Sequence, residues 1–120
     1  MKRTVLFKGT GTALVTPFTT NGSVDGKALR RLVKFQIQNG VEAIIPSGTT
    51  GEGATLSDAE QQSVTRIVVE EANKKVKIIA GAGSNDTSKV IKLAQHAVDA
   101  GADAVLCVTP YYNKPTQEGL

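Results

Sequence analysis

The chain has 120 residues, of which 40% are hydrophobic and 21% are charged, a composition typical of one globular domain rather than of a disordered or membrane-embedded chain. The net charge of +3 comes from scattered lysines and arginines, and the chain has three Phe, two Tyr and no Trp to stack on bases. Nucleic acid is therefore not expected as a partner.

The first residues are basic, but the apolar run from Val5 to Phe7 is too short for a signal-peptide core or a membrane span. A cytoplasmic location and no membrane partner are therefore expected. The single cysteine, Cys107, lies within an apolar run, which predicts a buried, reduced thiol in the core rather than a nucleophile, a metal ligand or a disulfide partner.

Short apolar runs alternate with amphipathic stretches along the chain. The runs predict four strands buried on both faces, at residues 12–15, 43–45, 76–80 and 104–108. The first predicted helix follows the N-cap Asp25 and ends at Asn39-Gly40. Its inward face is predicted to carry Leu29, Leu32, Val33 and Ile37.

The second predicted helix begins with Ser57 and Glu60 in capping-box register and ends near Asn73. The third begins between Asn85 and Thr87 and ends at Ala100-Gly101. The residues predicted to face inward from these two helices are Val64, Ile67, Val68, Val90, Leu93, Ala94, Ala97 and Val98.

The resulting β-α-β-α-β-α-β order has no linker or low-complexity segment, so residues 1–120 are expected to form one unit without an internal domain boundary. The segments that lead into the second and fourth predicted strands, residues 39–44 and 100–105, resemble each other in sequence. Their separation corresponds to two repeats of about thirty residues each. The order predicts an α/β fold with a parallel sheet and right-handed crossovers, either open and doubly wound or part of a barrel.

The loop Ser47-Gly48-Thr49-Thr50-Gly51-Glu52 stands between a strand and a helix, where parallel α/β proteins bind ligands. Hydroxyls at Thr49 and Thr50 and flexible glycines suit a small anion such as a carboxylate. The alternative is a β-to-α turn whose Gly and Thr residues serve only turn geometry.

Other glycine-rich segments do not fit nucleotide motifs. Gly81-Ala82-Gly83 is followed by Asp86 where a dinucleotide fingerprint needs its third glycine, and residues 48–55 lack the lysine of a P-loop. No clustered ligand spacing indicates a metal, and His96 is expected to be a half-exposed helix residue.

The loop Thr109-Pro110-Tyr111-Tyr112-Asn113-Lys114-Pro115 also follows a predicted strand. A tyrosine in this stiffened polar turn can pass a proton, although both rings can instead pack against a neighbouring element or subunit. We expect one ring to pack and the other to act in proton transfer.

Four segments together resemble the dihydrodipicolinate synthase family, over nearly the whole chain. They are residues 11–18, GTALVTPF; residues 48–56, GTTGEGATL; residues 80–85, AGAGSN; and residues 108–115, VTPYYNKP. The wider superfamily, with N-acetylneuraminate lyase and the keto-deoxy-sugar aldolases, shares the second segment, but the Tyr-Tyr-Asn-Lys-Pro run is more typical of the synthases.

The resemblance implies a TIM barrel that condenses pyruvate with aspartate semialdehyde through a lysine Schiff base, in lysine and diaminopimelate biosynthesis, with no metal or organic cofactor. It implies that Thr50 holds the pyruvate carboxylate and that Thr49 relays protons between a later tyrosine and Tyr112. It also implies a homo-oligomer, a dimer or tetramer, in which Tyr112 reaches a neighbouring subunit. In this family the Schiff-base lysine lies at a sequence position that would follow Leu120.

Because a complete barrel takes about 250 residues, the chain is expected to be the amino-terminal half of a (β/α)8 barrel, inactive alone and with unpaired edges on its outer strands. The resemblance also places Lys89 where lysine-inhibited relatives have a glutamate, so weak or absent lysine inhibition is expected. Two alternatives stay open: a sugar-acid aldolase of the same superfamily, and a binding or assembly module without catalysis.

Overall fold

The computed structural model describes residues 4–120 and has four strands alternating with three helices. The strands are β1 (Gly11–Ala13), β2 (Ala43–Ile45), β3 (Lys77–Gly81) and β4 (Ala104–Leu106). The helices are α1 (Gly26–Gln38), α2 (Asp58–Ala72) and α3 (Thr87–Ala100), and a 3₁₀ turn, η1, spans Gln117–Gly119. The predicted element order is therefore confirmed, with strand limits shifted by one or two residues.

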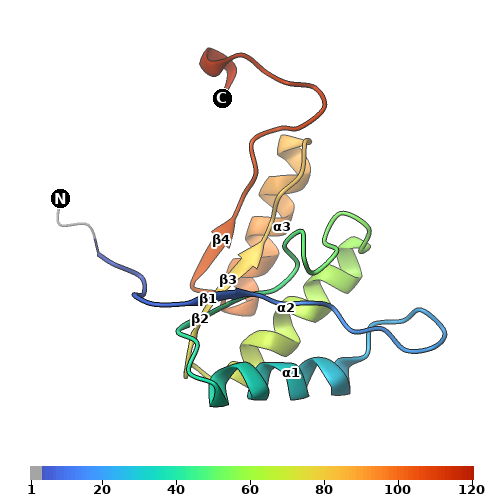
Figure 1. Ribbon diagram of the computed structural model, residues 1–120. Helices are drawn as coiled ribbons and strands as arrows, with labels where there is room; N and C mark the ends of the chain where they lie inside the picture. Colours follow the sequence, from blue (N-terminus) through green and yellow to red (C-terminus); the bar gives the residue numbers. More distant parts are fainter. Residues whose placement is uncertain (1–3) are drawn as a thin grey trace.

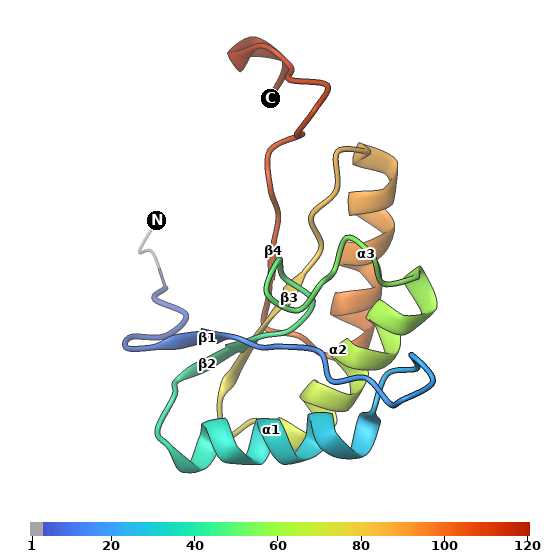
Figure 2. The same ribbon diagram turned by 45° about the vertical axis from the view of Figure 1, so that its right-hand side comes forward.

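All strand pairs are parallel, and the sheet order β1-β2-β3-β4 follows the sequence. Gly11 pairs with Ala43, Ala43 with Lys77, and Ile79 with Ala104. The helices lie together on one side of the sheet, while the segments before β1 and after β4 extend away from it (Figures 1 and 2). The fold is α/β, as in the amino-terminal half of a TIM barrel.

The predicted helix limits are confirmed because local capping fixes them. The Asp25 side chain accepts a hydrogen bond from the Ala28 amide at the start of α1. Ser57 and Glu60 form a reciprocal capping box at the start of α2. α3 begins after Asp86 and ends at Gly101, whose φ of 89° is readily adopted only by glycine.

The hydrophobic core lies between the helices and one face of the sheet. Ile44 of β2, Ile78 of β3 and Leu14, which follows β1, belong to this layer. The helix side chains that meet them include Leu29, Val33, Val64 and Val68, all with at most 1% of their surface exposed. The inner strands and the first two helices therefore form most of the core.

Burial on both faces of every strand was predicted and is wrong for β1 and β4. Their residues are mostly exposed, because these strands are the sheet edges and only one face of the sheet is covered by helices. Val98 of α3 was predicted to face inward but is 64% exposed, since Leu93 and Ala97 make the inward contacts of that helix. Within residues 4–120, no helix has the length and apolar character needed to cross a membrane.

Candidate functional site

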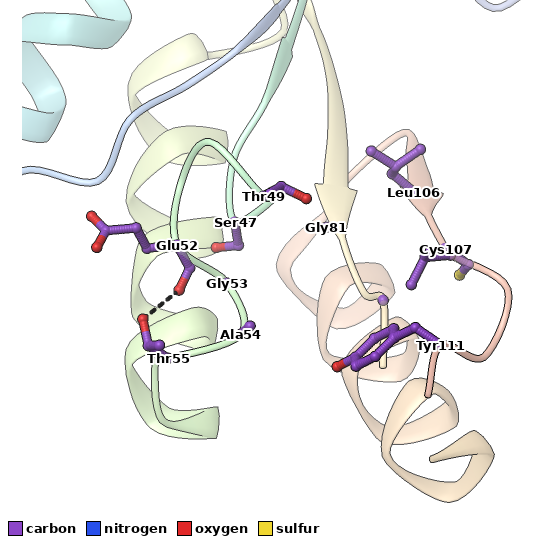
Figure 3. Close-up of a pocket in the computed structure, with 13 residues that line it drawn as sticks. Ser47, Thr49, Glu52, Gly53, Ala54, Thr55, Gly81, Leu106, Cys107 and Tyr111 are labelled. Carbon is purple, nitrogen blue, oxygen red and sulfur yellow. Dashed lines mark hydrogen bonds between the residues drawn. The ribbon is translucent and has the colours of Figure 1, made fainter. Parts of the chain in front are cut away.

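The carboxyl ends of β2, β3 and β4 meet around a cavity of about 590 Å³ (Figure 3). Three chain segments, each leaving one of these strands, form its walls. This is the edge at which parallel α/β folds bind ligands. The lining residues are Ser47, Gly48, Thr49, Glu52, Gly53, Ala54, Thr55, Gly81, Gly83, Leu106, Cys107, Val108 and Tyr111.

The wall formed after β2 turns sharply at Ser47, which has a φ of 56° and is 4% exposed. The Ser47 carbonyl oxygen points into a space left free by two glycines. A Cβ atom on Gly53 would lie 2.2 Å from this oxygen, and one on Gly81 would lie 2.1 Å from it. Because no side chain fits at those distances, both glycines are needed for the close packing of this loop against β3.

Two hydrogen bonds within the loop close it on itself. The Glu52 amide donates to the Thr49 carbonyl at 3.0 Å, and the Gly53 amide donates to the Gly48 carbonyl at 3.1 Å. Two buried side chains bind it from outside: Thr16 donates to the Gly51 carbonyl at 2.6 Å, and Gln61 donates to the Gly53 carbonyl at 2.8 Å. The loop is therefore fixed without help from a ligand.

The fixed loop leaves its own donors available. Within residues 4–120, the backbone amides from Gly48 to Gly51 donate to no protein acceptor, and neither do the hydroxyls of Thr49 and Thr50. The Glu52 carboxylate points away from Thr49 and Tyr111 (Figure 3). Consecutive uncharged donors of this kind favour a small anion.

The predicted site residues do not all reach the cavity. Thr49 lines it, with its hydroxyl pointing toward β3 (Figure 3). Thr50 is exposed and is not part of the lining. Tyr112 is 91% exposed and also lies outside, whereas Tyr111 contributes a half-exposed ring to the wall. Within this chain, the cavity therefore brings together Thr49 and Tyr111.

Cys107 was predicted to be buried in the core, and that prediction is wrong. The thiol belongs to an exposed residue in the cavity wall. An apolar run implies burial only when neighbours cover the strand, and β4 is an edge of the sheet with β3 as its single strand partner among residues 4–120. His96 is partly buried as expected, but it lies between α2 and α3, away from this cavity.

Sequence reasoning missed the residues that shape the loop from a distance. Thr16 lies 35 positions before the carbonyl it binds, and the left-handed turn at Ser47 is not typical of serine. Gln61 is eight positions from its acceptor, and its place on the first turns of the helix after the loop was a usable signal. Thr16 carried no comparable local signal.

The cap of α2, which follows this loop, contains a carboxylate with a shifted pKa. The Ser57 amide and hydroxyl both donate to the Glu60 carboxylate at 2.8 Å, which lowers the pKa of Glu60 below its ordinary value.

No lysine is among the residues that line the cavity. In the described part of the chain, no cluster of three or more His, Cys, Asp or Glu residues is arranged to hold a metal ion.

Comparison with known proteins agrees with the fold. Residues 6–120 match the Dihydrodipicolinate synthetase family. The chain belongs to this family. The 4-hydroxy-tetrahydrodipicolinate synthase of Geobacter sulfurreducens is 60% identical over 115 residues, which cover 96% of this chain and 39% of that protein. The chain thus spans about two fifths of the length of the curated relatives it matches.

Solved structures of family members superpose closely on the chain. A dihydrodipicolinate synthase from Acinetobacter baumannii, described as chloride-inhibited and complexed with pyruvate, matches with a TM-score of 0.90 and 50% identity over 92% of this chain and 38% of that one. A dihydrodipicolinate synthase variant described as the first monomeric one matches with a TM-score of 0.90 and 49% identity, over 95% of this chain and 38% of that one.

The loop after β4 is more exposed than the loop after β2. Tyr112 and Lys114 have φ values of 66° and 38°, in the left-handed region that non-glycine residues rarely adopt. Asn113 holds the turn through its amide, which donates to the Tyr111 carbonyl at 2.8 Å, and through its side chain, which donates to the Asn85 carbonyl at 3.2 Å. These bonds leave the Tyr112 ring projecting from the molecule.

Proposed function

We propose that this chain supplies the pyruvate-binding loop of a 4-hydroxy-tetrahydrodipicolinate synthase, which condenses pyruvate with aspartate semialdehyde in lysine and diaminopimelate biosynthesis. The observation that carries the proposal is the row of free amides and hydroxyls from Gly48 to Gly51 beside the cavity. Pyruvate has one carboxylate, and uncharged donors at the end of a strand can hold it without a metal or an organic cofactor.

The chemistry needs an amine in addition to this loop. A lysine forms an imine with the pyruvate carbonyl and releases water, and the protonated imine nitrogen then draws electrons from the methyl carbon. After losing a proton, that carbon forms a bond to the aldehyde carbon of the second substrate. Because no lysine lines the cavity, we place this amine in the part of the barrel that the chain does not include.

Thr50 is the proposed carboxylate ligand, and Thr49 and Tyr112 are the proposed proton relay. Thr49 is at the cavity wall, which supports its part in the relay. Tyr112 is 91% exposed, so it can enter the relay by reaching a neighbouring subunit of a dimer or tetramer. Thr50 is exposed beside the wall, and binding of pyruvate there requires its amide or hydroxyl to face the remaining half of the barrel.

Residues 1–120 would then be the amino-terminal portion of one cytoplasmic barrel domain and inactive alone. Exposed apolar residues at the two edge strands support this division, since Leu106 of β4 and Val15 and Val108, which follow β1 and β4, are each 50% exposed. Apolar residues gathered at sheet edges in this way are expected to be covered in the working protein.

A chimera tests the proposal. Residues 6–120 replace the matching segment of the Geobacter sulfurreducens relative, and the protein is treated with pyruvate and borohydride. Mass spectrometry should find one reduced pyruvyl adduct on a lysine of the relative's segment, and none should form on the 120-residue chain alone. A folded chimera that forms no adduct, or an adduct on a lysine of this chain, contradicts the proposal.

The aldehyde substrate requires a second measurement. The chimera, supplied with pyruvate, is offered aspartate semialdehyde and, separately, N-acetylmannosamine or a sugar aldehyde. Faster turnover of aspartate semialdehyde supports the synthase. Preference for a sugar aldehyde would instead assign the chain to the aldolases of the same superfamily, and adduct formation without turnover of any aldehyde would leave only a binding role.

A further inference from the structure

The pyruvate-binding loop is held at two backbone carbonyls by side chains from different elements. Thr16, which follows β1, donates to the Gly51 carbonyl, and Gln61, on α2, donates to the Gly53 carbonyl. Both residues are 5% exposed. Neither lines the cavity, so neither is placed to touch a bound substrate.

We propose that Thr16 and Gln61 are positioning residues, which aim the free donors of Gly48 to Gly51 at the substrate. This inference rests on the proposed function and assigns a role to two residues outside the reacting groups. The two hydrogen bonds are accepted by the carbonyls of the residues directly before and after Glu52, in the part of the loop that leads to α2.

The path from each anchor to the donors is short. The Gly53 amide binds the Gly48 carbonyl and the Glu52 amide binds the Thr49 carbonyl, so displacement of residues 51–53 shifts residues 48 and 49 as well. Ser47 cannot absorb the movement, because its carbonyl oxygen is packed against Gly53 and Gly81. The donors therefore keep their direction only while both anchors are in place.

The orientation of Gln61 supports positioning over simple packing. Because a carbonyl accepts but does not donate, the amide NH₂ of Gln61 must face the Gly53 oxygen. The Gln61 Oε1 atom is buried and accepts no hydrogen bond in the described part of the chain. Burying an unpartnered acceptor destabilises a fold, so an apolar residue of similar shape would serve packing at least as well. The hydrogen bond that the Gln61 side chain makes to the loop therefore accounts for a polar residue at this position.

The test uses the chimera, in which each anchor is removed with little change of shape. Gln61→Met and Thr16→Val delete the donor, Thr16→Ser keeps it, and Gln62→Met is the matched control. Gln62 is next to Gln61 on α2 but faces His96, with 3.4 Å between its Nε2 and the histidine Nε2. Steady-state kinetics with pyruvate, thermal unfolding and hydrogen exchange of the peptide spanning residues 48–53 are measured for each variant.

We expect kcat/KM for pyruvate to fall about tenfold to a hundredfold in Gln61→Met and in Thr16→Val, as for other displacements of about 1 Å near a reacting group. Exchange in residues 48–53 should rise in the same two variants. Thr16→Ser should recover most of the activity, and Gln62→Met should match the unsubstituted chimera. Unfolding temperature should fall only modestly in Gln61→Met, because removal of the unpartnered Gln61 Oε1 offsets part of the cost of leaving the Gly53 carbonyl without a donor.

Gln61→Glu adds a pH readout that packing alone would not produce. A carboxylate at this position repels the Gly53 oxygen, whereas a protonated carboxyl group can donate to it. The activity of Gln61→Glu relative to the unsubstituted chimera should therefore rise as the pH falls. Unchanged kinetics and exchange in Gln61→Met and Thr16→Val would overturn the proposal. An inactive unsubstituted chimera would instead count against the proposed function.

Discussion

The loops after β2 and β4 leave the same edge of the sheet but are built differently. The first is packed around the buried Ser47 carbonyl and bound from outside by two buried side chains. The second carries Tyr112 at 91% exposure and is held by two bonds at Asn113. This chain therefore preforms the loop after β2, whereas the proposed function requires a neighbouring subunit to position Tyr112.

The largest expected effect is on the packed loop. Gly53→Ala places a Cβ atom 2.2 Å from the Ser47 oxygen, so the backbone must move, at a cost of about 3 kcal/mol in the free energy of unfolding. Gly48→Ala is the matched control, because its nearest neighbour would be the Ile45 Cγ2 atom at 3.8 Å. Urea unfolding of both variants of the chain measures the difference, and equal stability would mean that the loop is not rigidly packed.

The next effect concerns the exposed loop. Tyr112→Phe in the chimera should lower kcat about a hundredfold, the lower end of the range for a lost general acid or base, while adduct trapping with pyruvate persists. Tyr111→Phe should have a smaller effect, because its ring is in the cavity wall and can pack without its hydroxyl. Loss of trapping in Tyr112→Phe would show that this loop acts in pyruvate binding rather than proton relay.

A smaller effect is expected where the packed loop joins α2. Ser57→Ala removes both the cap of α2 and a donor to Glu60, at a cost of about 1 kcal/mol in stability. The hydrogen bonds from Ser57 lower the pKa of Glu60 in the folded chain. The charged Glu60 carboxylate therefore stabilises the fold above its unfolded pKa of about 4.3, and this stabilisation is lost as the pH falls through the lower folded pKa. Urea unfolding at pH 7 and pH 3 should therefore show a smaller difference between Ser57→Ala and the parent at pH 3.

The smallest expected effect is that of free lysine on the enzyme's rate. Lys89, in the first turn of α3, has its Nζ atom 3.5 Å from the carboxylate of Asp58 at the start of α2. The positive charge of Lys89 would repel the ammonium group of a lysine effector bound between these helix ends. Millimolar lysine should therefore change the rate of the chimera little, while Lys89→Glu should increase its sensitivity. Strong inhibition of the unsubstituted chimera would contradict this expectation.

Features set by neighbouring residues were predictable from the sequence. The caps at Asp25 and Ser57 and the stop at Gly101 depend on contacts within a few positions, and all were predicted. The placement of the Thr49-Thr50 loop at a strand end follows from the same alternation of elements.

Features set by distant residues were not predictable. The anchoring of Gly51 by Thr16 depends on how β1 and β2 pair, which no local pattern contains. The exposure of Cys107 and Val98 depends on which neighbours cover β4 and α3. Hydrophobicity alone indicates that a residue can be buried, but it does not indicate whether a neighbour covers it. The roles of Thr49, Thr50 and Tyr112 stay predictions until the variants are measured.

The strictly sequential sheet order has a consequence for synthesis on the ribosome. Each strand pairs with the strand that precedes it in the chain, so no strand must wait for a partner made much later. Chains emerge from the ribosome amino terminus first, at about 5–20 residues per second, so each strand meets its partner soon after both have been made. The packed loop needs only β1, β2, α2 and β3, and can therefore adopt its final form while the ribosome is still elongating the rest of the polypeptide.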